Sequence, residues 1–198
     1  MKFYFCPRTR AFRILWLVEE MGLPCERVLV DIRDEQARSD PEFRRASPLG
    51  KVPALVDGDT RLWDSGAIAL YLADKHPDAG LGVPVGHRQR GAFLQWVMFN
   101  NAVLEPALGE KFAKVEPNSS QSGHGSFDLM IGLLETALGQ GPWLLGERFT
   151  VADTLVGSGV HFMQLFGALP DSPVLAAYLD RCRARPAFGR AMEAEEAA

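Results

Sequence analysis

The chain has 198 residues, enough for one large domain or two small ones with a buried hydrophobic core. Hydrophobic residues make up 47% of the sequence and charged residues 23%, and the formal net charge of −4 comes without the basic tail or stripe that nucleic-acid binding requires. No apolar run approaches the ~18 residues of a membrane span, and the start of the chain lacks the basic segment and apolar core of a signal peptide. We therefore expect a cytoplasmic protein with no membrane or nucleic-acid partner.

The cysteines and histidines indicate no metal site. Cys6, Cys25 and Cys182 form no CxxC pair, and an odd number of cysteines gives no closed disulfide framework. Such usage suits a reducing compartment. No pair of histidines has the spacing of metal ligands, so we expect no bound metal.

The first 77 residues show, in order, the patterns of a strand, a helix, a second strand, a short helix, a hairpin and a final helix. These segments cover residues 2–5, 8–21, 26–30, 41–46, 54–63 and the stretch from Ser65 to the His76-Pro77 pair. The first strand, helix and second strand imply a crossover connection between parallel strands. This order is compatible with a four-stranded thioredoxin-like layer.

After residue 77 the pattern changes. Residues 78–86 read as a linker, and residues 87–198 carry no strand signal, so we expect an all-helical second domain. Its first helix covers about 92–112, with a kink expected at Pro106. The sequence Thr150-Val151-Ala152-Asp153 predicts a capping box, in which the Asp153 carboxylate accepts a hydrogen bond from the N–H of Thr150 before a buried helix. We interpret Asp153 as a structural cap and not as a catalytic acid.

A candidate binding site lies in the hairpin and the helix that follows it. Pro53 stands at the first residue of a strand, where its missing N–H is tolerated. In the cis form, which is accessible to X-Pro bonds, Pro53 would leave the backbone N–H and C=O of Val52 unpaired and able to bind an extended peptide. Ser65 is the expected N-cap of the next helix, whose first N–H groups attract a carboxylate, and Asp64 offers a negative charge to an ammonium group.

These motifs, Gly50-Lys51-Val52-Pro53-Ala54-Leu55 and Asp64-Ser65-Gly66-Ala67-Ile68, resemble the glutathione site of the glutathione S-transferases. The resemblance implies that Val52, before Pro53, pairs with the cysteinyl backbone of glutathione. It also implies that Asp64 and Ser65 hold the γ-glutamyl end and that Lys51 binds the glycyl carboxylate. The family more often has Glu where this chain has Asp64. Glutathione is then a co-substrate of the enzyme.

The similarity continues along the chain, because the segments at 144–153 and 178–188 resemble late segments of the same family. The implied architecture is an α/β thioredoxin-like N-terminal domain followed by an all-α domain. The implied protein is a homodimer in which glutathione is conjugated to apolar electrophiles, a reaction of detoxification.

The segment between the first strand and the first helix contains the candidates for activating the thiol. The phrase Pro7-Arg8-Thr9-Arg10-Ala11-Phe12-Arg13 resembles a bacterial and fungal branch of the family that has Ser at the position of Thr9. Thr9 is therefore the first candidate for stabilising the glutathione thiolate, and a helix N-cap is the structural alternative. Arg10 can add positive potential near the thiol.

Cys6 indicates an alternative reaction. A Cys-Pro pair before a helix resembles the omega-type transferases and the monothiol glutaredoxins, in which the cysteine forms a mixed disulfide with glutathione. The alternative enzyme is thus a Cys6-dependent thiol transferase or disulfide reductase. The same fold also serves non-enzymatic binding modules.

The second substrate is expected between the two domains, against the long helix, in an apolar pocket that would favour aromatic or alkyl electrophiles. Five residues are candidates for lining this pocket. They are Phe99, Asn100, Val103, Leu104 and Phe112.

Overall fold

The computed structural model describes residues 1–115, 118 and 121–198 of the chain. No described helix has both the length and the apolar character needed to cross a membrane.

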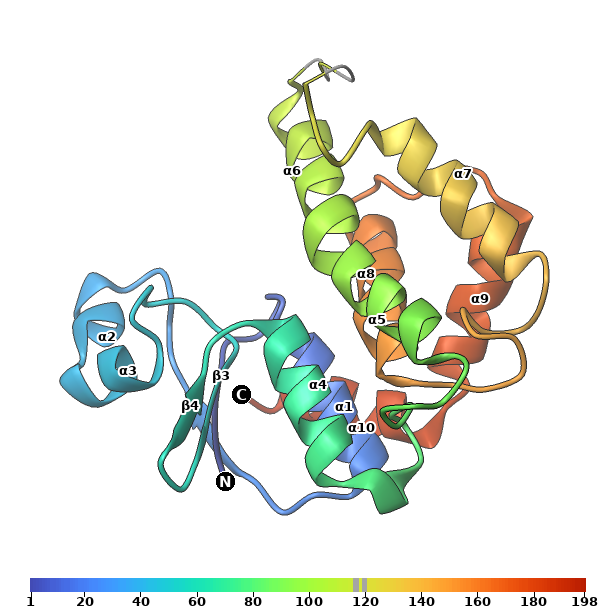
Figure 1. Cartoon of the computed structure of the whole chain (residues 1–198). Helices are drawn as coiled ribbons and strands as arrows, with labels where there is room; N and C mark the ends of the chain where they lie inside the picture. Colours follow the sequence, from blue (N-terminus) through green and yellow to red (C-terminus); the bar gives the residue numbers. More distant parts are fainter. Residues whose placement is uncertain (116–117, 119–120) are drawn as a thin grey trace. The chain divides into compact units, whose positions relative to one another are not determined.

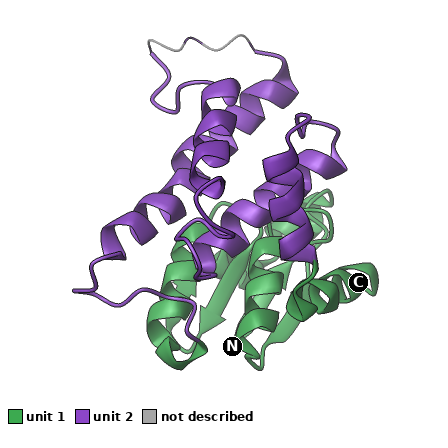
Figure 2. Ribbon diagram, turned by 90° about the vertical axis from the view of Figure 1, so that its right-hand side faces the viewer, with its two compact units in different colours: residues 1–79, 184–198 green, residues 80–183 purple. Residues whose placement is uncertain are grey.

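The described residues form two compact units, coloured separately in Figure 2. The sheet unit combines residues 1–79 with residues 184–198, and the helical unit covers residues 80–183. The domains expected from the sequence, 1–77 and 87–198 on either side of a linker, assign the last helix differently. In the structure that helix packs on the first helix of the sheet unit. The sequence pattern does not show this packing, because the residues that make it are far apart in the sequence.

The sheet unit contains a four-stranded mixed sheet in the order β2-β1-β3-β4, as the thioredoxin-like prediction requires. β1 pairs in parallel with β2 and antiparallel with β3, and β3 pairs antiparallel with β4. The elements of this unit are β1 (Lys2–Phe5), α1 (Phe12–Met21), β2 (Glu26–Leu29), α2 (Glu35–Ser39), α3 (Pro41–Ala46), β3 (Ala54–Asp57), β4 (Thr60–Leu62), α4 (Ser65–Lys75), η1 (Pro77–Ala79) and α10 (Pro186–Glu196).

The first strand and first helix form much of the core of the sheet unit. Phe3, Tyr4 and Phe5 of β1 are all buried, and α1 buries an unbroken run of residues from Phe12 to Val18. The prediction of α1 began at Arg8, four residues too early. The segment from Cys6 to Ala11 forms turns instead, and Arg8 has a φ of +57°, which is incompatible with an α-helix.

The helical unit contains only helices as regular elements among its described residues, as the sequence predicts. These are α5 (Arg90–Phe99), a π-helical turn η2 (Asn100–Leu104), α6 (Glu105–Ala113), α7 (Phe127–Leu138), α8 (Val151–Leu165) and α9 (Pro173–Arg183), which can be followed in Figure 1.

The long helix expected over residues 92–112 is present as the consecutive segments α5, η2 and α6. Its π-helical turn ends at Leu104, two residues before Pro106. A proline inside a helix removes an N–H donor, and its ring crowds the carbonyl four residues earlier, so the hydrogen-bond ladder opens into a π-helical turn.

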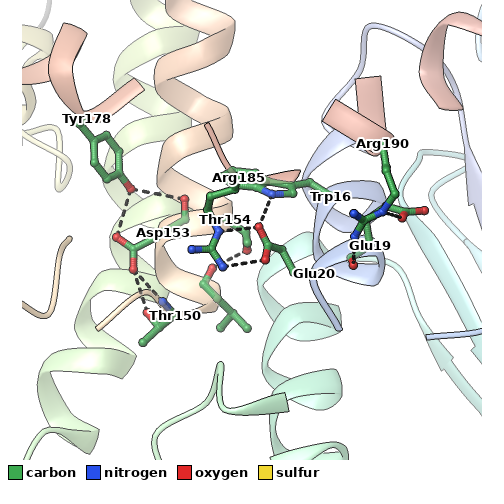
Figure 3. Close-up of polar contacts among 10 residues, drawn as sticks. Trp16, Glu19, Glu20, Thr150, Asp153, Thr154, Tyr178, Arg185 and Arg190 are labelled. Carbon is green, nitrogen blue, oxygen red and sulfur yellow. Dashed lines mark hydrogen bonds and ion pairs between the residues drawn. The ribbon is translucent and has the colours of Figure 1, made fainter. Parts of the chain in front are cut away.

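The capping box predicted before α8 is present and nearly fully buried (Figure 3). The Asp153 carboxylate accepts hydrogen bonds from the N–H of Thr150 at 2.9 Å, the N–H of Leu144 at 3.0 Å and the hydroxyl of Tyr178 at 3.2 Å. Burial raises the pKa of Asp153 to about 6, although these donors oppose the shift. Asp153 therefore closes the start of α8 and ties it to the preceding loop and to α9.

Candidate functional site

The residues predicted for the site in the sheet unit lie at one end of the sheet. In the antiparallel β1–β3 pair Tyr4 lies opposite Ala54, so the continuation of this register brings Cys6 level with Val52. The chain leaves β1 at this end and enters the loop that leads to α1. The Cys6 loop and the start of β3 are therefore neighbours.

The β3–β4 hairpin brings the Asp64-Ser65 motif to the same end of the sheet. Leu55 lies opposite Leu62, so the same register continued outward brings Pro53 level with Asp64. Helix α4 begins directly after Asp64. The N-terminal ends of α1 and α4 thus both lie at the end of the sheet where β1 ends and β3 begins (Figure 1).

Thr9 organises the loop between β1 and α1. Its hydroxyl donates a hydrogen bond to the carbonyl oxygen of Cys6 at 2.7 Å and accepts one from the N–H of Ala11 at 3.2 Å. The carbonyl of Thr9 accepts from the N–H of Phe12 at 3.2 Å. Thr9 is not the N-cap of α1, because that position is Ala11 and no side chain caps this helix; the Thr9 hydroxyl stabilises the turn before it. A hydroxyl hydrogen rotates freely about the C–O bond, so the same group can donate to an incoming thiolate.

The Val52–Pro53 peptide bond is cis, the form that the sequence analysis considered. Val52 lies outside the strand ladder, and the hydrogen bonds found among the described residues use neither its N–H nor its C=O. This backbone position can pair with an extended peptide.

Ser47 is a residue that the sequence analysis did not consider. Its buried hydroxyl donates to the carbonyl of Lys51 at 2.7 Å and accepts from the N–H of Lys51 at 3.1 Å. Gly50, whose φ of +63° favours glycine, completes the tight turn. The backbone of Lys51 is fixed in this way while its side chain remains exposed. A serine just before a Pro-Leu-Gly turn was the available signal.

Asp64, and not Ser65, is the N-cap of α4, which corrects the expectation. Oδ1 of Asp64 accepts from the N–H of Gly66 at 2.9 Å and from that of Ala67 at 3.1 Å. The extended backbone of Asp64 allows this, whereas Ser65 is already the first helical residue. Ser65 is buried, and within the described part of the chain its N–H and hydroxyl bond to no other residue. Two donors therefore remain at the start of α4.

Cys6 and Arg10, the other two residues predicted for this end of the sheet, differ in exposure. Cys6 is a free thiol with only 4% of its surface exposed. Arg10 is partly exposed in the turn before α1.

The five residues predicted for the second-substrate pocket differ in burial. Phe99, Asn100 and Leu104 are buried, and a Cβ atom at Gly159 would lie 2.9 Å from Leu104, so this leucine is tightly packed against α8. Val103 is partly exposed, and Phe112 is 41% exposed.

A cavity of about 490 Å³ lies between α6 and α7. None of the five residues lines it. Its lining is mixed in charge, with Glu110, Lys111, Lys114 and Asp128 among the lining residues. In the described part of the chain no group of three or more His, Cys, Asp or Glu side chains is placed to hold a metal ion.

The chain has a thioredoxin-like sheet domain and an all-helical domain, and two helix N-termini lie beside a cis-proline turn. Comparison with known proteins identifies the class of protein that combines these features. Residues 1–74 match the model of the glutathione S-transferase N-terminal domain, and residues 124–190 match that of the C-terminal domain. The disulfide-bond oxidoreductase YfcG of Escherichia coli K12 is 31% identical over 203 residues, covering 96% of this chain and 93% of the relative. The chain belongs to the glutathione S-transferase family.

Solved structures agree with this assignment. A glutathione transferase from Methylococcus capsulatus superposes with a TM-score of 0.86 at 31% identity, covering 100% of this chain and 99% of the other. A sphingomonad glutathione S-transferase complexed with glutathione gives a TM-score of 0.84 at 27% identity over the whole of both chains.

Proposed function

We propose that the protein is a glutathione transferase that conjugates the glutathione thiolate to apolar electrophiles. The observation that carries this proposal is the convergence of Thr9, Val52 and Ser65 at one end of the sheet. Each offers a polar group that suits a different part of the tripeptide. Membership of the family supports the same reading.

The tripeptide is bound, in this proposal, along the cis-proline edge. Its cysteinyl backbone pairs with Val52, and its γ-glutamyl carboxylate accepts from the N–H and hydroxyl of Ser65 at the positive end of α4. The carboxylate of Asp64 attracts the γ-glutamyl ammonium group, and Lys51 attracts the glycyl carboxylate. Pro53 keeps the Val52 edge outside the strand ladder.

The chemical task of the site is to make thiolate at neutral pH. A thiol with a pKa of about 8.5 is only ~3% ionised at pH 7, and each unit of depression corresponds to ~1.4 kcal/mol in favour of the anion. A hydrogen bond from the Thr9 hydroxyl, the N-terminus of α1 and the charge of Arg10 all favour the anion. The thiolate then attacks the electrophilic carbon and forms a C–S bond; with an aromatic halide, the carbon–halogen bond breaks and the halide ion leaves. We also propose that the protein is a cytoplasmic homodimer that acts in detoxification, as is usual in the family.

A second candidate function is the reduction of disulfides, which the name of the relative YfcG supports. In that reaction a thiolate attacks a disulfide sulfur and the other sulfur leaves as a thiolate. If Cys6 were the attacking group it would form a mixed disulfide with glutathione. The burial of Cys6 weighs against this role, because an attacking thiol has to be reached by the disulfide.

The two reactions are separated by two assays on the same proteins. Conjugation is measured with an aromatic halide and glutathione, and reduction with a low-molecular-weight disulfide and glutathione, in wild type and Cys6→Ser. We expect conjugation in both proteins. Reduction that is lost in Cys6→Ser, with no conjugation in either protein, would replace the proposal by the Cys6 reaction. Glutathione binding without either turnover would indicate a binding module.

A further inference from the structure

Helix α10 runs antiparallel to α1 within the sheet unit and is fixed at its start by a partly buried ion pair (Figure 3). The Arg185 guanidinium donates to both carboxylate oxygens of Glu20, at 2.6 and 2.7 Å. Glu20 also accepts from the indole N–H of Trp16 at 2.8 Å, and its side chain is only 7% exposed. A bidentate pair with this burial is specific in geometry and weakly screened.

Two further residues of α10 also contact α1. The ring of Phe188 meets Phe12 and Trp16 edge-on, with centroid distances of 5.2 and 5.0 Å. Arg190 donates to the Glu19 carboxylate at 2.8 Å. Helix α10 thus packs along α1, and its last turn lies beside the loop that precedes α1.

At that far end Glu195 contacts the loop that carries Thr9. Its Oε1 atom accepts a hydrogen bond from the backbone N–H of Arg8 at 2.9 Å. Arg8 has a φ of +57°, a left-handed conformation that non-glycine residues rarely adopt and that persists only where the surroundings fix it. Burial raises the pKa of Glu195, and the neighbouring carboxylate of Glu196 acts in the same direction, while the N–H and charge of Arg8 oppose both.

We infer that Glu195 is a positioning residue for the thiolate-stabilising loop: by accepting the Arg8 N–H it holds the strained turn that presents the Thr9 hydroxyl. This inference rests on the proposed role of Thr9. Without the acceptor, Arg8 relaxes toward right-handed conformations, and the hydroxyl one residue later is displaced. The residues proposed to bind the tripeptide, Val52 and Ser65, come from other segments, so binding is retained while thiol ionisation is impaired.

The test compares Glu195→Ala and Glu195→Gln with Glu196→Ala, a neighbouring exposed glutamate, as the matched control. The readouts are the thermal midpoint, the glutathione dissociation constant, the pH midpoint of bound-thiol ionisation from thiolate absorbance, and kcat for an aromatic halide at pH 6.5. For Glu195→Ala we expect a midpoint shifted upward by roughly half a unit and a kcat about threefold lower, because less thiolate forms. We expect the dissociation constant to stay within about twofold of wild type.

Glu195→Gln separates positioning from charge, since its amide oxygen also accepts from an N–H. We expect it to behave as wild type in midpoint and kcat, as does Glu196→Ala. A folded Glu195→Ala protein with an unchanged ionisation midpoint would overturn the positioning role and leave the proposed function standing. A wild-type protein without any bound thiolate would overturn the proposed function and this inference with it.

Discussion

Oδ1 of Asp64 lies 2.9 Å from the backbone nitrogen of Gly66 and accepts its hydrogen bond, so the residue proposed to hold an ammonium group also caps α4. In the proposed function, one carboxylate thus serves both the stability of the helix and the charge of the site. Asparagine caps a helix as well as aspartate does but carries no charge, so a single substitution separates the two contributions.

Asp64→Asn is predicted to keep the free energy of unfolding within about 0.5 kcal/mol of wild type while the glutathione dissociation constant rises about three- to tenfold. Isothermal titration calorimetry and urea unfolding measure the two effects. The matched control is Asp34→Asn, an exposed N-cap that accepts from the N–H of Gln36 at 2.9 Å on α2. An Asp64→Asn protein with wild-type affinity would show that the carboxylate only caps the helix.

Ser65→Ala is predicted to weaken glutathione binding severalfold with little change in stability, because no described residue bonds to its hydroxyl. Affinity is again measured by calorimetry. Ser158→Ala serves as the control, since this buried serine of α8 donates to the carbonyl of Leu155 at 2.8 Å and has no proposed ligand. Unchanged affinity in Ser65→Ala would remove Ser65 from the site.

The capping box of α8 predicts a large loss of stability on Asp153→Ala. The N–H groups of Leu144 and Thr150 lose their buried acceptor, as does the hydroxyl of Tyr178. We expect the free energy of unfolding to fall by about 2–4 kcal/mol, against about 0.5 kcal/mol for the exposed cap in Asp34→Ala. Urea unfolding followed by circular dichroism measures both. Equal small losses would contradict the assignment of Asp153 as the structural cap.

His161 of α8 predicts a pH dependence of stability. Burial and then the charge of Arg183 lower the pKa of His161 to about 4, and its Nδ1 lies 3.2 Å from the Arg183 guanidinium. Below the ordinary pKa of about 6.5 the unfolded chain binds a proton that the folded chain does not, so stability is lost as the pH falls from 6.5 to 4.

His161→Gln keeps an acceptor for Arg183 but does not titrate. Between pH 7.5 and 5 we expect wild type to lose about 1–2 kcal/mol more than this variant, measured by urea unfolding at both pH values. The raised pKa of Asp153 makes stability fall as the pH rises from about 4 to 6, and this opposite contribution is common to both proteins. Parallel pH profiles would contradict a neutral His161 in the folded state.

The strands, the hairpin and most helices were predictable, because alternation, helical periodicity and Asp-Gly turn signals are local properties of the sequence. The short helix α2 (Glu35–Ser39) was missed, because it buries no residue and so shows no apolar period. The start of α1 was not. A left-handed Arg8 has no sequence signature, since glycine is the residue expected there. The choice between Asp64 and Ser65 as cap was likewise open, because both residue types cap helices and only the backbone decides.

Features that depend on distant residues escaped prediction. The packing of α10 on α1 rests on Arg185 and Glu20, which are separated by 165 residues, so the sequence alone grouped α10 with the other helices. The apolar pattern of α5 to α6 predicts a pocket lining, but core packing gives the same pattern, so the sequence does not separate the two; Phe99, Asn100 and Leu104 are buried. Ser47 was missed because a buried serine that holds a turn resembles any loop serine.

The decisive measurement is a titration of thiolate absorbance with bound glutathione across pH 5 to 9 in wild type, Thr9→Ala and Thr9→Ser. We predict a saturable thiolate signal in wild type with a midpoint well below the ordinary thiol pKa of about 8.5, and a midpoint about one unit higher in Thr9→Ala. Thr9→Ser, which keeps the hydroxyl, should match wild type. An unchanged midpoint in Thr9→Ala, or a signal that disappears only in Cys6→Ser, would contradict the assignment of Thr9 as the thiolate donor.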